Sequence, residues 1–460
     1  MKIELINAFK KIVGDAHVLT SKEELLCYSY DATPGFSHMP DAVISPADTR
    51  EVSQVLALAN REQIPVYPRG SGTNLSAGTV PTKGGIVLLM TRFNKIVEID
   101  AANLVATAEP GVVVGDLNKA VEEFGLIYPP DPGTVATATL GGTVSENAGG
   151  LRGLKYGVSK HYVMGLEVVL ADGAVIQTGG KNVKDVSGYD LTKLFTGAEG
   201  TLGVITKITV KLVPAPEARK AMMAIFSNLD NAGNAISAII ANKIIPATLE
   251  IMDNATIRTV EDYAKVGLPI SAEAVLLIEV DGIPAVVEKE ADKVFEVLKA
   301  NNADEIRVAK DAGERDKIWA ARRAALPALA KLRPTTFVED ATVPRSEVPN
   351  MIRAVNESAA RHRVTIGTFG HAGDGNLHPT IVCDLRNEEE MERVYKAMDE
   401  IFATAIKLGG TLSGEHGIGL GKLRYMEDQF GAAGMAAMRA IKKALDPNCI
   451  LNPGKLVGEC

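Results

Sequence analysis

Apolar and polar positions in the first part of the chain follow two different periods. Residues 51–63 carry apolar side chains at the three-to-four-residue spacing of an amphipathic helix, and the following run 64–68 is extended in character. Glycine is dense from Pro68 to Gly203, and strand-like apolar runs at 85–90 and 166–170 separate the glycine clusters. This pattern predicts an α/β unit whose strands run into glycine-rich loops.

The pattern changes around residues 213–216, where we place a domain boundary. Residues 217–407 are rich in helical periodicity and poor in glycine, with scattered strands predicted at 274–280, 335–338 and 379–383. Such an order predicts an α+β domain whose sheet is mostly antiparallel. A further glycine-rich loop and a helix follow. The predicted organisation is therefore a first domain at 1–216, a cap or substrate domain at 217–408, and a C-terminal segment at 409–460 that returns to the first domain.

Charge and composition narrow the class of protein. The chain has 57 acidic and 49 basic residues, a net charge of -8, and no basic run longer than a pair, which argues against a nucleic-acid partner. Its lysine-containing start lacks the apolar core of a secretory signal, and its apolar stretches are far shorter than the ~20 residues of a membrane span, so we expect a cytoplasmic protein. The four cysteines lack CxxC spacing, which argues against an iron–sulfur cluster within this chain.

Glycine clusters in three segments, PRGSGTNLSAG at 68–78, TLGGTVSENAGG at 139–150 and GAEGTLGVIT at 197–206. A pyrophosphate needs several backbone N–H groups directed at it, and glycine-rich turns let the chain approach closely enough to supply them. One such loop is a weak signal, because any strand-to-helix turn can carry two glycines. Three loops on one stretch of chain indicate a nucleotide cofactor, although turns in a glycine-rich β domain remain an alternative.

These three segments, with PPDPGTVATATLGGTVSENAGG at 129–150 in full, resemble the FAD-contacting segments of the vanillyl-alcohol-oxidase (PCMH-type) flavoprotein superfamily. Within it, the whole chain is similar to the branch of FAD-binding D-lactate dehydrogenases and the flavin subunit of glycolate oxidase. The resemblance implies an α+β protein with a PCMH-type FAD-binding domain of two α/β subdomains and an α+β cap domain with a mostly antiparallel sheet. The Rossmann fingerprint does not occur in these loops. Because residues 68–78 contain no histidine, we expect FAD to bind non-covalently.

The resemblance also implies which residues contact FAD. The first loop would hold the pyrophosphate, the second would line the flavin and ribityl path, and the third would border the adenine. The implied contacts are Pro68, Arg69, Gly70, Ser71, Gly72, Thr73, Asn74, Gly78, Pro132, Thr139, Gly142, Ser145, Gly150, Glu199, Gly200, Gly203, Val204 and Ile205. Asn452, in the ending Asn-Pro-Gly-Lys, is a further candidate for the flavin or the site, although Leu-Asn-Pro-Gly is also a plain turn signal.

Three of the seven histidines fall in two glycine-bracketed motifs, GHAGDGNLH at 370–378 and SGEHG at 413–417. The intervening Ala-Gly-Asp-Gly-Asn has strong turn character, so a chain reversal would bring His371 and His378 to one side. Two imidazoles with a nearby carboxylate suit a divalent metal that keeps open positions. Histidines that only hydrogen-bond within turns are the alternative.

In the D-2-hydroxy-acid dehydrogenase branch, motifs like these supply two histidines and a glutamate to a metal. The resemblance therefore implies His371, His378 and Glu415 as ligands, His416 as the catalytic base, and Asn376 as a residue that touches the substrate. Because neighbouring side chains in an extended loop point apart, Glu415 can ligate while His416 faces the substrate. Fe²⁺, Zn²⁺ and Mn²⁺ all accept this ligand set.

A 2-hydroxy acid also needs a partner for its carboxylate, and arginine provides a bidentate one. Arg322 and Arg323 follow the only tryptophan on a predicted helix and point about 100° apart, so at most one faces a pocket. The family pattern of an arginine three residues after the tryptophan implies Arg322, whereas an Arg-Arg pair is otherwise typical of a solvated helix face. Relatives that take dicarboxylates have a basic residue where this chain has Glu339 and Asp340, which favours a short monocarboxylate.

Together these features predict a flavoenzyme that oxidises D-lactate or glycolate to the 2-oxo acid. Without a cluster of its own, the protein would pass electrons to an acceptor protein such as an electron-transferring flavoprotein or an iron–sulfur subunit. Two alternatives are a metal-free alcohol or alditol oxidase of the same superfamily, which metal content would distinguish, and a flavin-bearing electron-transfer subunit. The sequence does not separate lactate from glycolate, and it leaves the metal, the acceptor and the oligomeric state open.

Overall fold

A computed structural model describes residues 1–459. The chain forms two compact units. The first consists of Met1–Gly149, Val158–Ala215 and the chain from Glu415 onward, and the second consists of Gly150–Gly157 and Pro216–Gly414.

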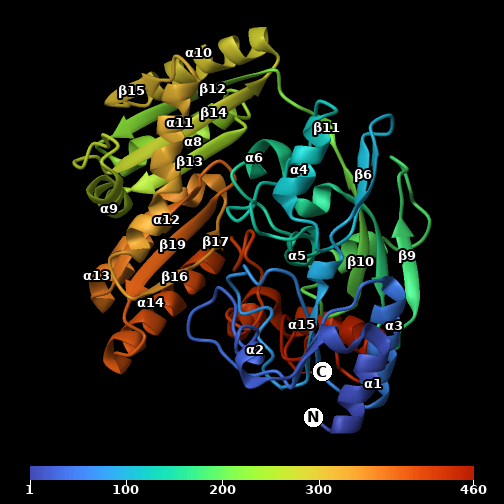
Figure 1. The fold of residues 1–460 in the computed structure, drawn as a ribbon. Coiled ribbons are helices and arrows are strands. Elements are labelled where there is room, and N and C mark those ends of the chain that lie inside the picture. Colours follow the sequence, from blue (N-terminus) through green and yellow to red (C-terminus); the bar gives the residue numbers. More distant parts are fainter. Residues whose placement is uncertain (460) are drawn as a thin grey trace. The chain divides into compact units, whose positions relative to one another are not determined.

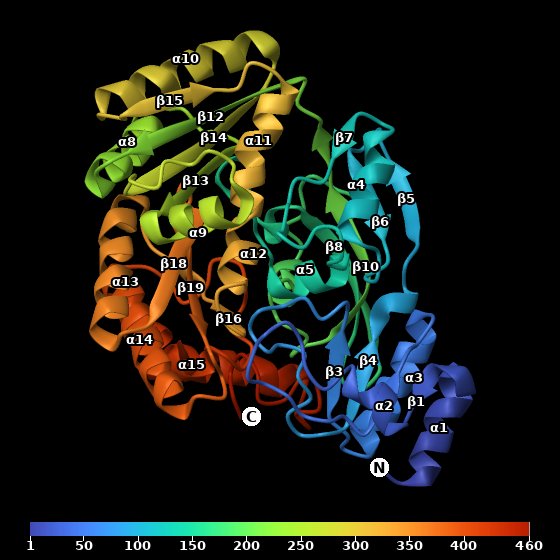
Figure 2. The same cartoon turned by 60° about the vertical axis from the view of Figure 1, so that its left-hand side comes forward.

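The first unit begins with a four-stranded sheet in the order β1-β2-β4-β3. Its strands are β1 (Val18–Leu19), β2 (Ala42–Ile44), β3 (Val66–Arg69) and β4 (Ile86–Leu89). The strands β2, β3 and β4 are parallel, and β1 is antiparallel to β2. The helices α1 (Ile3–Val13) and α3 (Thr49–Arg61) bury their apolar sides beside this sheet, and α2 (Lys22–Leu26) precedes β2 (Figure 2). The predicted helix at 51–63 and the strand after it are present as α3 and β3.

A second sheet of this unit is antiparallel, with five strands in the order β5-β6-β10-β8-β9. Its strands are β5 (Ile96–Asp100), β6 (Val105–Ala108), β8 (Val163–Val169), β9 (Val175–Gly179) and β10 (Val204–Lys211). The remaining elements are α4 (Val114–Glu122), α5 (Leu140–Glu146), α7 (Leu191–Phe195), α15 (Met426–Leu445) and the short pair β7 (Leu126–Ile127) and β11 (Val213–Pro214). The three glycine-rich segments therefore follow β3, surround α5, and join α7 to β10.

The second unit is built on an eight-stranded sheet in the order β15-β12-β14-β13-β18-β19-β16, with β17 also paired to β19 (Figure 1). Its strands are β12 (Ala218–Phe226), β13 (Thr248–Asp253), β14 (Ala274–Gly282), β15 (Glu305–Val308), β16 (Thr335–Val338), β17 (Ala341–Thr342), β18 (Thr365–His371) and β19 (Asn376–Cys383). Each pairing between these strands is antiparallel, which confirms the predicted sheet type.

Helices cover both faces of this sheet. The helices α9 (Asn254–Ala264), α11 (Ala312–Arg323) and α12 (Ala325–Ala330) pack on one face, over a core that includes Met252, Leu277 and Phe369. The helices α8 (Leu229–Ala241), α10 (Pro284–Ala300), α13 (Val348–His362) and α14 (Glu388–Lys407) lie together on the sheet, and α6 (Gly153–Tyr156) contacts β13. Because side chains alternate along each strand, Glu250 shares the first face with Met252, and His371 shares it with Phe369.

The region after residue 217 contains more strand than the sequence predicted. The predicted strands at 274–280, 335–338 and 379–383 are present as β14, β16 and β19, whereas β12, β13, β15 and β18 were not predicted. The strand β12 reads ARKAMMAIF, whose alanine, lysine and methionine favour a helix, but it is paired on both sides in the sheet. Tertiary pairing therefore overrides local propensity in this strand.

Asp253 gives the second unit a measurable pH dependence. It caps α9 by accepting a hydrogen bond from the Thr256 amide at 2.9 Å, and burial raises its pKa to about 6. Between pH ~4, where the unfolded side chain ionises, and pH ~6, unfolding releases a proton, so stability falls as the pH rises through this window. We expect wild type to lose about 1–3 kcal/mol of unfolding free energy relative to Asp253→Asn between these pH values. Urea unfolding of both proteins at pH 4 and 6.5 measures the difference, and a gap that does not change with pH contradicts the prediction.

Within residues 1–459, no helix combines the length and the apolar content that a bilayer crossing requires.

Candidate active site

The two histidines of the GHAGDGNLH motif lie on one β-hairpin of the second unit. His371 is the last residue of β18 and pairs with Asn376 of β19. His378 of β19 pairs with Phe369 of β18. This diagonal relation puts both imidazoles on the same face, with ring centroids 5.0 Å apart and rings nearly perpendicular. A ligand nitrogen of one lies within 4.8 Å of a ligand nitrogen of the other. In the turn between them, Gly375 (φ 82°) packs closely against another segment, because a Cβ there would meet the Val343 carbonyl oxygen at 1.9 Å.

Glu250 on β13 connects one histidine to the predicted substrate arginine. Its fully buried carboxylate contacts His371 Nδ1 at 2.6 Å through Oε1 and accepts a hydrogen bond from Arg322 Nε at 2.6 Å through Oε2. Burial alone would raise the pKa of Glu250, but the charges of His371 and Arg322 and their hydrogen bonds hold it below its ordinary value. Because Nδ1 is directed at this acid, Nε2 is the ring nitrogen through which His371 would ligate a metal, an arrangement common around metal-binding histidines.

The two arginines of α11 point in different directions. Arg322 is largely buried, and its guanidinium lies 4.5 Å from the centroid of the Phe369 ring on the sheet. Arg323 is exposed and donates a hydrogen bond to the Asp316 carbonyl on its own helix. Only Arg322 therefore reaches the sheet face that carries the two histidines. Its Nε is taken by Glu250, so the terminal amino groups are the ones it can offer to a carboxylate.

Asp340 organises the other side of the hairpin. It is fully buried, accepts a hydrogen bond from the Asn376 side-chain amide, and accepts from Ser413 Oγ at 2.5 Å and the Gly414 amide at 2.9 Å. His378 Nδ1 lies 3.9 Å from its carboxylate and 3.3 Å from the Glu339 carbonyl oxygen. Asp340 therefore fastens the chain at Gly414 to the hairpin, one residue before Glu415.

In the first unit, the three glycine-rich segments lie close together, and some of their contacts involve backbone without an intervening side chain. A Cβ at Gly70 would lie 2.1 Å from Thr139 Oγ1, so the first and second segments touch through a bare backbone. Asn452 donates hydrogen bonds to the Gly78 carbonyl at 2.9 Å and the Glu199 carbonyl at 2.7 Å, which ties the first segment to the third. The side chain of Asn74 accepts from the Gly78 amide within the first loop.

The other predicted FAD contacts lie on or beside these segments. Thr139 caps α5, which contains Gly142 and Ser145, while Pro132 precedes this helix and Gly150 opens the short segment assigned to the second unit. The residues that follow β3 are Gly70, Ser71, Gly72, Thr73, Asn74 and Gly78, and those of the third segment are Glu199, Gly200, Gly203, Val204 and Ile205.

Three buried polar atoms among these segments have no hydrogen-bond partner within residues 1–459, namely Ser76 Oγ, Glu146 Oε2 and Asn452 Oδ1. Each comes from a different part of the chain: the first loop, the end of α5 and the C-terminal segment. Buried polar groups of proteins are normally paired, so such atoms mark places where a polar ligand bonds. Together with the bare-backbone contact at Gly70, they fit an extended nucleotide cofactor such as FAD.

Glu415 and His416 begin the last segment of the first unit. A Cβ built at Gly149, in the second glycine-rich segment, would lie 2.9 Å from Glu415 Oε2, so this carboxylate packs directly on the predicted flavin path. His416 Nε2 lies 3.7 Å from Glu415 Oε1, and both side chains are mostly buried. This pair therefore stands beside the glycine-rich segments within one unit.

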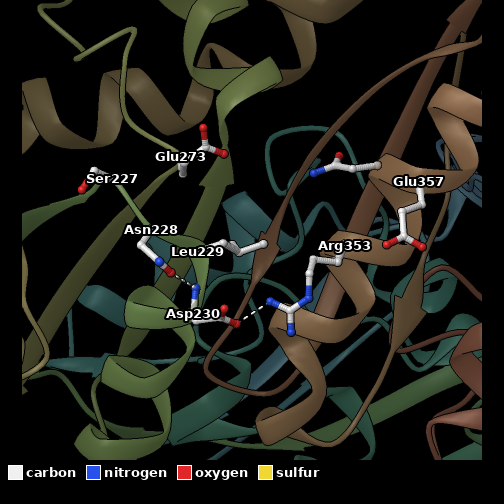
Figure 3. Close-up of a pocket in the computed structure, with 8 residues that line it drawn as sticks. Ser227, Asn228, Leu229, Asp230, Glu273, Arg353 and Glu357 are labelled. Atoms are coloured by element: carbon white, nitrogen blue, oxygen red, sulfur yellow. Dashed lines mark hydrogen bonds and ion pairs between the residues drawn. The ribbon is translucent and has the colours of Figure 1, made fainter.

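A separate cavity of about 530 Å³ opens on the second unit and contains none of the predicted site residues (Figure 3). Its polar lining includes an ion pair between Asp230 and Arg353, and Asn228, which caps α8. Because none of the predicted site residues lines this cavity, it is not the candidate site.

Sequence reasoning missed Glu250 and gave Asp340 a different significance. An acid inside the apolar strand run Leu249-Glu250-Ile251 is a signal for a buried, paired carboxylate, and it could have been found. From the sequence alone, Asp340 is only an acid that disfavours a second substrate carboxylate. The structure shows that it also holds Asn376 and Gly414 in place.

Comparison with known proteins defines the class of protein. Residues 215–456 match the protein family described as "FAD linked oxidases, C-terminal domain", and residues 40–179 match the family described as "FAD binding domain". The chain therefore belongs to the FAD-linked oxidase family and is an FAD-binding oxidoreductase. This agrees with the resemblance seen in the glycine-rich segments.

Individual relatives span almost the whole chain. A glycolate oxidase subunit GlcD of Bacillus subtilis (strain 168) is 56% identical over 446 residues, which cover 97% of this chain and 95% of the relative. A D-lactate dehydrogenase of Archaeoglobus fulgidus is 38% identical over 94% of this chain and 95% of the relative. Among solved structures, p-cresol methylhydroxylase with bound substrate superposes with a TM-score of 0.83 at 21% identity, covering 99% of this chain and 97% of the other. This likeness confirms the PCMH-type fold.

Proposed function

We propose that this protein oxidises a short D-2-hydroxy monocarboxylic acid, D-lactate or glycolate, to the 2-oxo acid. The observation that carries the proposal is the carboxylate of Glu250, which holds a histidine at 2.6 Å on one side and an arginine at 2.6 Å on the other. One carboxylate thereby orients both a metal ligand and an anion-binding group. Two relatives, a glycolate oxidase subunit and a D-lactate dehydrogenase, support the same substrate class.

The metal in this proposal is held by His371, His378 and Glu415. The first two share one face of the hairpin, and Glu415 follows directly after Gly414, which Asp340 fastens to that hairpin. Histidine nitrogens and a carboxylate oxygen suit Fe²⁺, Zn²⁺ or Mn²⁺. When bound, such an ion supplies positive charge that lowers the pKa of a coordinated hydroxyl, and bound FAD supplies N5 as the hydride acceptor.

The remaining work falls to the chain's own side chains. His416 accepts the proton of the substrate hydroxyl, and Arg322 binds the substrate carboxylate through its terminal amino groups. Asn376 donates its amide hydrogens to Asp340 and to Thr342 Oγ1, which leaves its carbonyl oxygen to accept a hydrogen bond from the substrate. Electrons leave through an acceptor protein such as an electron-transferring flavoprotein or an iron–sulfur subunit.

An anaerobic titration of the purified flavoprotein tests this function. Either D-lactate or glycolate should bleach the flavin absorbance, L-lactate should not, and metal analysis should find about one divalent ion per chain. Bleaching by an alditol without any bound metal would favour the alternative oxidase, and failure of every hydroxy acid would favour an electron-transfer subunit.

Replacing Arg322 should weaken substrate capture more than the chemical step. In Arg322→Ala the substrate carboxylate loses a charge-assisted bidentate partner, and we expect the half-saturating D-lactate or glycolate concentration for flavin reduction to rise about 10- to 100-fold. Arg323→Ala is the matched control, because that side chain is exposed on the same helix. Unchanged saturation in Arg322→Ala would remove this residue from the substrate site.

A further inference from the structure

Glu199 of the third glycine-rich segment joins four parts of the first unit. Its amide donates to the Ser145 carbonyl at 2.9 Å, and its carbonyl accepts from Asn452 Nδ2 at 2.7 Å. Its carboxylate accepts from the Ile418 amide at 2.7 Å and from the Gly419 amide at 2.6 Å. The backbone of this residue thus connects the flavin segments, while its side chain holds the loop that contains Glu415 and His416.

The backbone conformation at Glu199 shows that this side chain is specifically placed. The residue has φ 50°, in the left-handed region that non-glycine residues rarely occupy, between Gly197 and Gly200. Such a conformation persists only when the surrounding contacts determine it. Here those contacts are the backbone hydrogen bonds with Ser145 and Asn452 together with the two loop amides, and the residue is only 6% exposed.

A second buried carboxyl group, that of Glu146, lies close to Glu199. Burial raises the pKa of Glu146 well above its usual range, and the neighbouring Glu199 raises it further. Burial raises the pKa of Glu199 too, but the amides of Ile418 and Gly419 oppose the rise. Of the two carboxyl groups, that of Glu199 is the one that accepts hydrogen bonds from both loop amides. Gly417 packs between them, because a Cβ there would lie 2.0 Å from Glu146 Oε2 and 3.0 Å from Glu199 Oε1.

We propose that Glu199 is a positioning residue for the reaction, which sets the place of Glu415 and His416 by holding the amides that follow them. The inference rests on the proposed function, since it takes His416 as the base. A displacement of about 1 Å at a catalytic group can slow a reaction ~10²-fold. A clamp on the amides that closely follow His416 is near enough to prevent such a displacement.

Two substitutions test the clamp, and both keep the Cβ, so the left-handed backbone costs the same. Glu199→Gln retains one acceptor oxygen and Glu199→Ala retains none. We expect flavin reduction at saturating hydroxy acid to slow ~10-fold in the first and ~10²-fold in the second, with the half-saturating concentration nearly unchanged. Hydrogen exchange of the peptide covering residues 415–420 should become faster in the same order.

Glu167→Gln is the matched control. Glu167 is another buried acid of this unit, and it accepts hydrogen bonds from Thr49, Gln177 and Thr206, none of which belongs to residues 415–420. It should lower thermal stability without changing exchange in residues 415–420 or the rate of flavin reduction.

Unchanged exchange at 415–420 in both Glu199 variants would overturn the clamp. Faster exchange with an unchanged rate of flavin reduction would overturn its positioning role. If the Glu199 variants are slow but His416→Ala is not, the positioning role stands and the assignment of the base fails. The exchange measurement needs no activity, so it tests the clamp even if no hydroxy acid proves to be a substrate.

Discussion

Flavin reduction by D-lactate or glycolate should slow at least ~10²-fold when His416 is replaced by alanine, because general base catalysis contributes about 10²- to 10⁴-fold to such reactions. FAD should remain bound, since the substitution leaves the three glycine-rich segments intact. Anaerobic stopped-flow absorbance of the flavin measures the rate directly and separates it from electron transfer to an acceptor.

Adding a base to the solution tests whether His416 acts as the base or only supports the structure of the site. Added imidazole should restore part of the rate in His416→Ala. His161→Ala is the control and should keep the wild-type rate. His161 lies in the same unit, but its ring accepts a hydrogen bond from the Val158 amide. A His416→Ala enzyme that reduces its flavin at the wild-type rate would show that another group removes the proton.

The sequence predicted those parts of the site whose geometry is set locally. The residues Ala-Gly-Asp-Gly-Asn between His371 and His378 favour a reversal, and the hairpin that they form puts the two imidazoles on one face. The α3 helix and the glycine-rich loop after β3 could also be predicted, because the sequence pattern of each lies within a short stretch of chain. The PCMH-type architecture followed from motif resemblance and is confirmed by the structural comparison.

The rest depends on contacts between distant parts of the chain. The strand β18 contains Gly367 and Gly370, which suggest a loop, yet a Cβ at Gly367 would lie 2.8 Å from Leu329 Cδ2 of α12, so packing requires the bare backbone. Residues 150–157 continue the glycine-rich character of the first unit but belong to the second. Nothing local signals this crossing, because Lys155 is held there by Asp281, more than a hundred residues away.

Glu250 is the clearest case of a residue that only tertiary structure explains. It meets His371 because Ile251 pairs with Gly370 in the register between β13 and β18, and it meets Arg322 because α11 crosses the same face. A shift of one residue in that register would turn its side chain to the opposite face of the sheet. The alternation of the strand shows a buried acid, but not which groups it serves.

Replacing Glu250 by glutamine should therefore affect both of its partners, the substrate-binding Arg322 and the metal ligand His371. A neutral amide is not a counter-charge, so in Glu250→Gln the Arg322 side chain would remain largely buried without its acid, and breaking such a pair typically costs about 3–5 kcal/mol of unfolding free energy. His371 would also lose the acid that fixes its tautomer, and loss of a partner behind a metal-bound histidine typically weakens metal affinity about 10- to 100-fold. Urea unfolding measures the first effect, and metal content after dialysis against graded chelator buffers measures the second.

Glu279→Gln separates these two effects. Glu279 lies on the neighbouring strand β14, is almost as buried as Glu250, and accepts a hydrogen bond from Trp319 Nε1 at 2.9 Å without contacting either His371 or Arg322. Because glutamine keeps one oxygen that can accept from Trp319, Glu279→Gln should reduce stability by at most about 1 kcal/mol and leave metal affinity at the wild-type value. If Glu250→Gln behaves like this control, the carboxylate serves the packing of the sheet alone, and the coupling of metal ligand to substrate anchor through one acid is wrong.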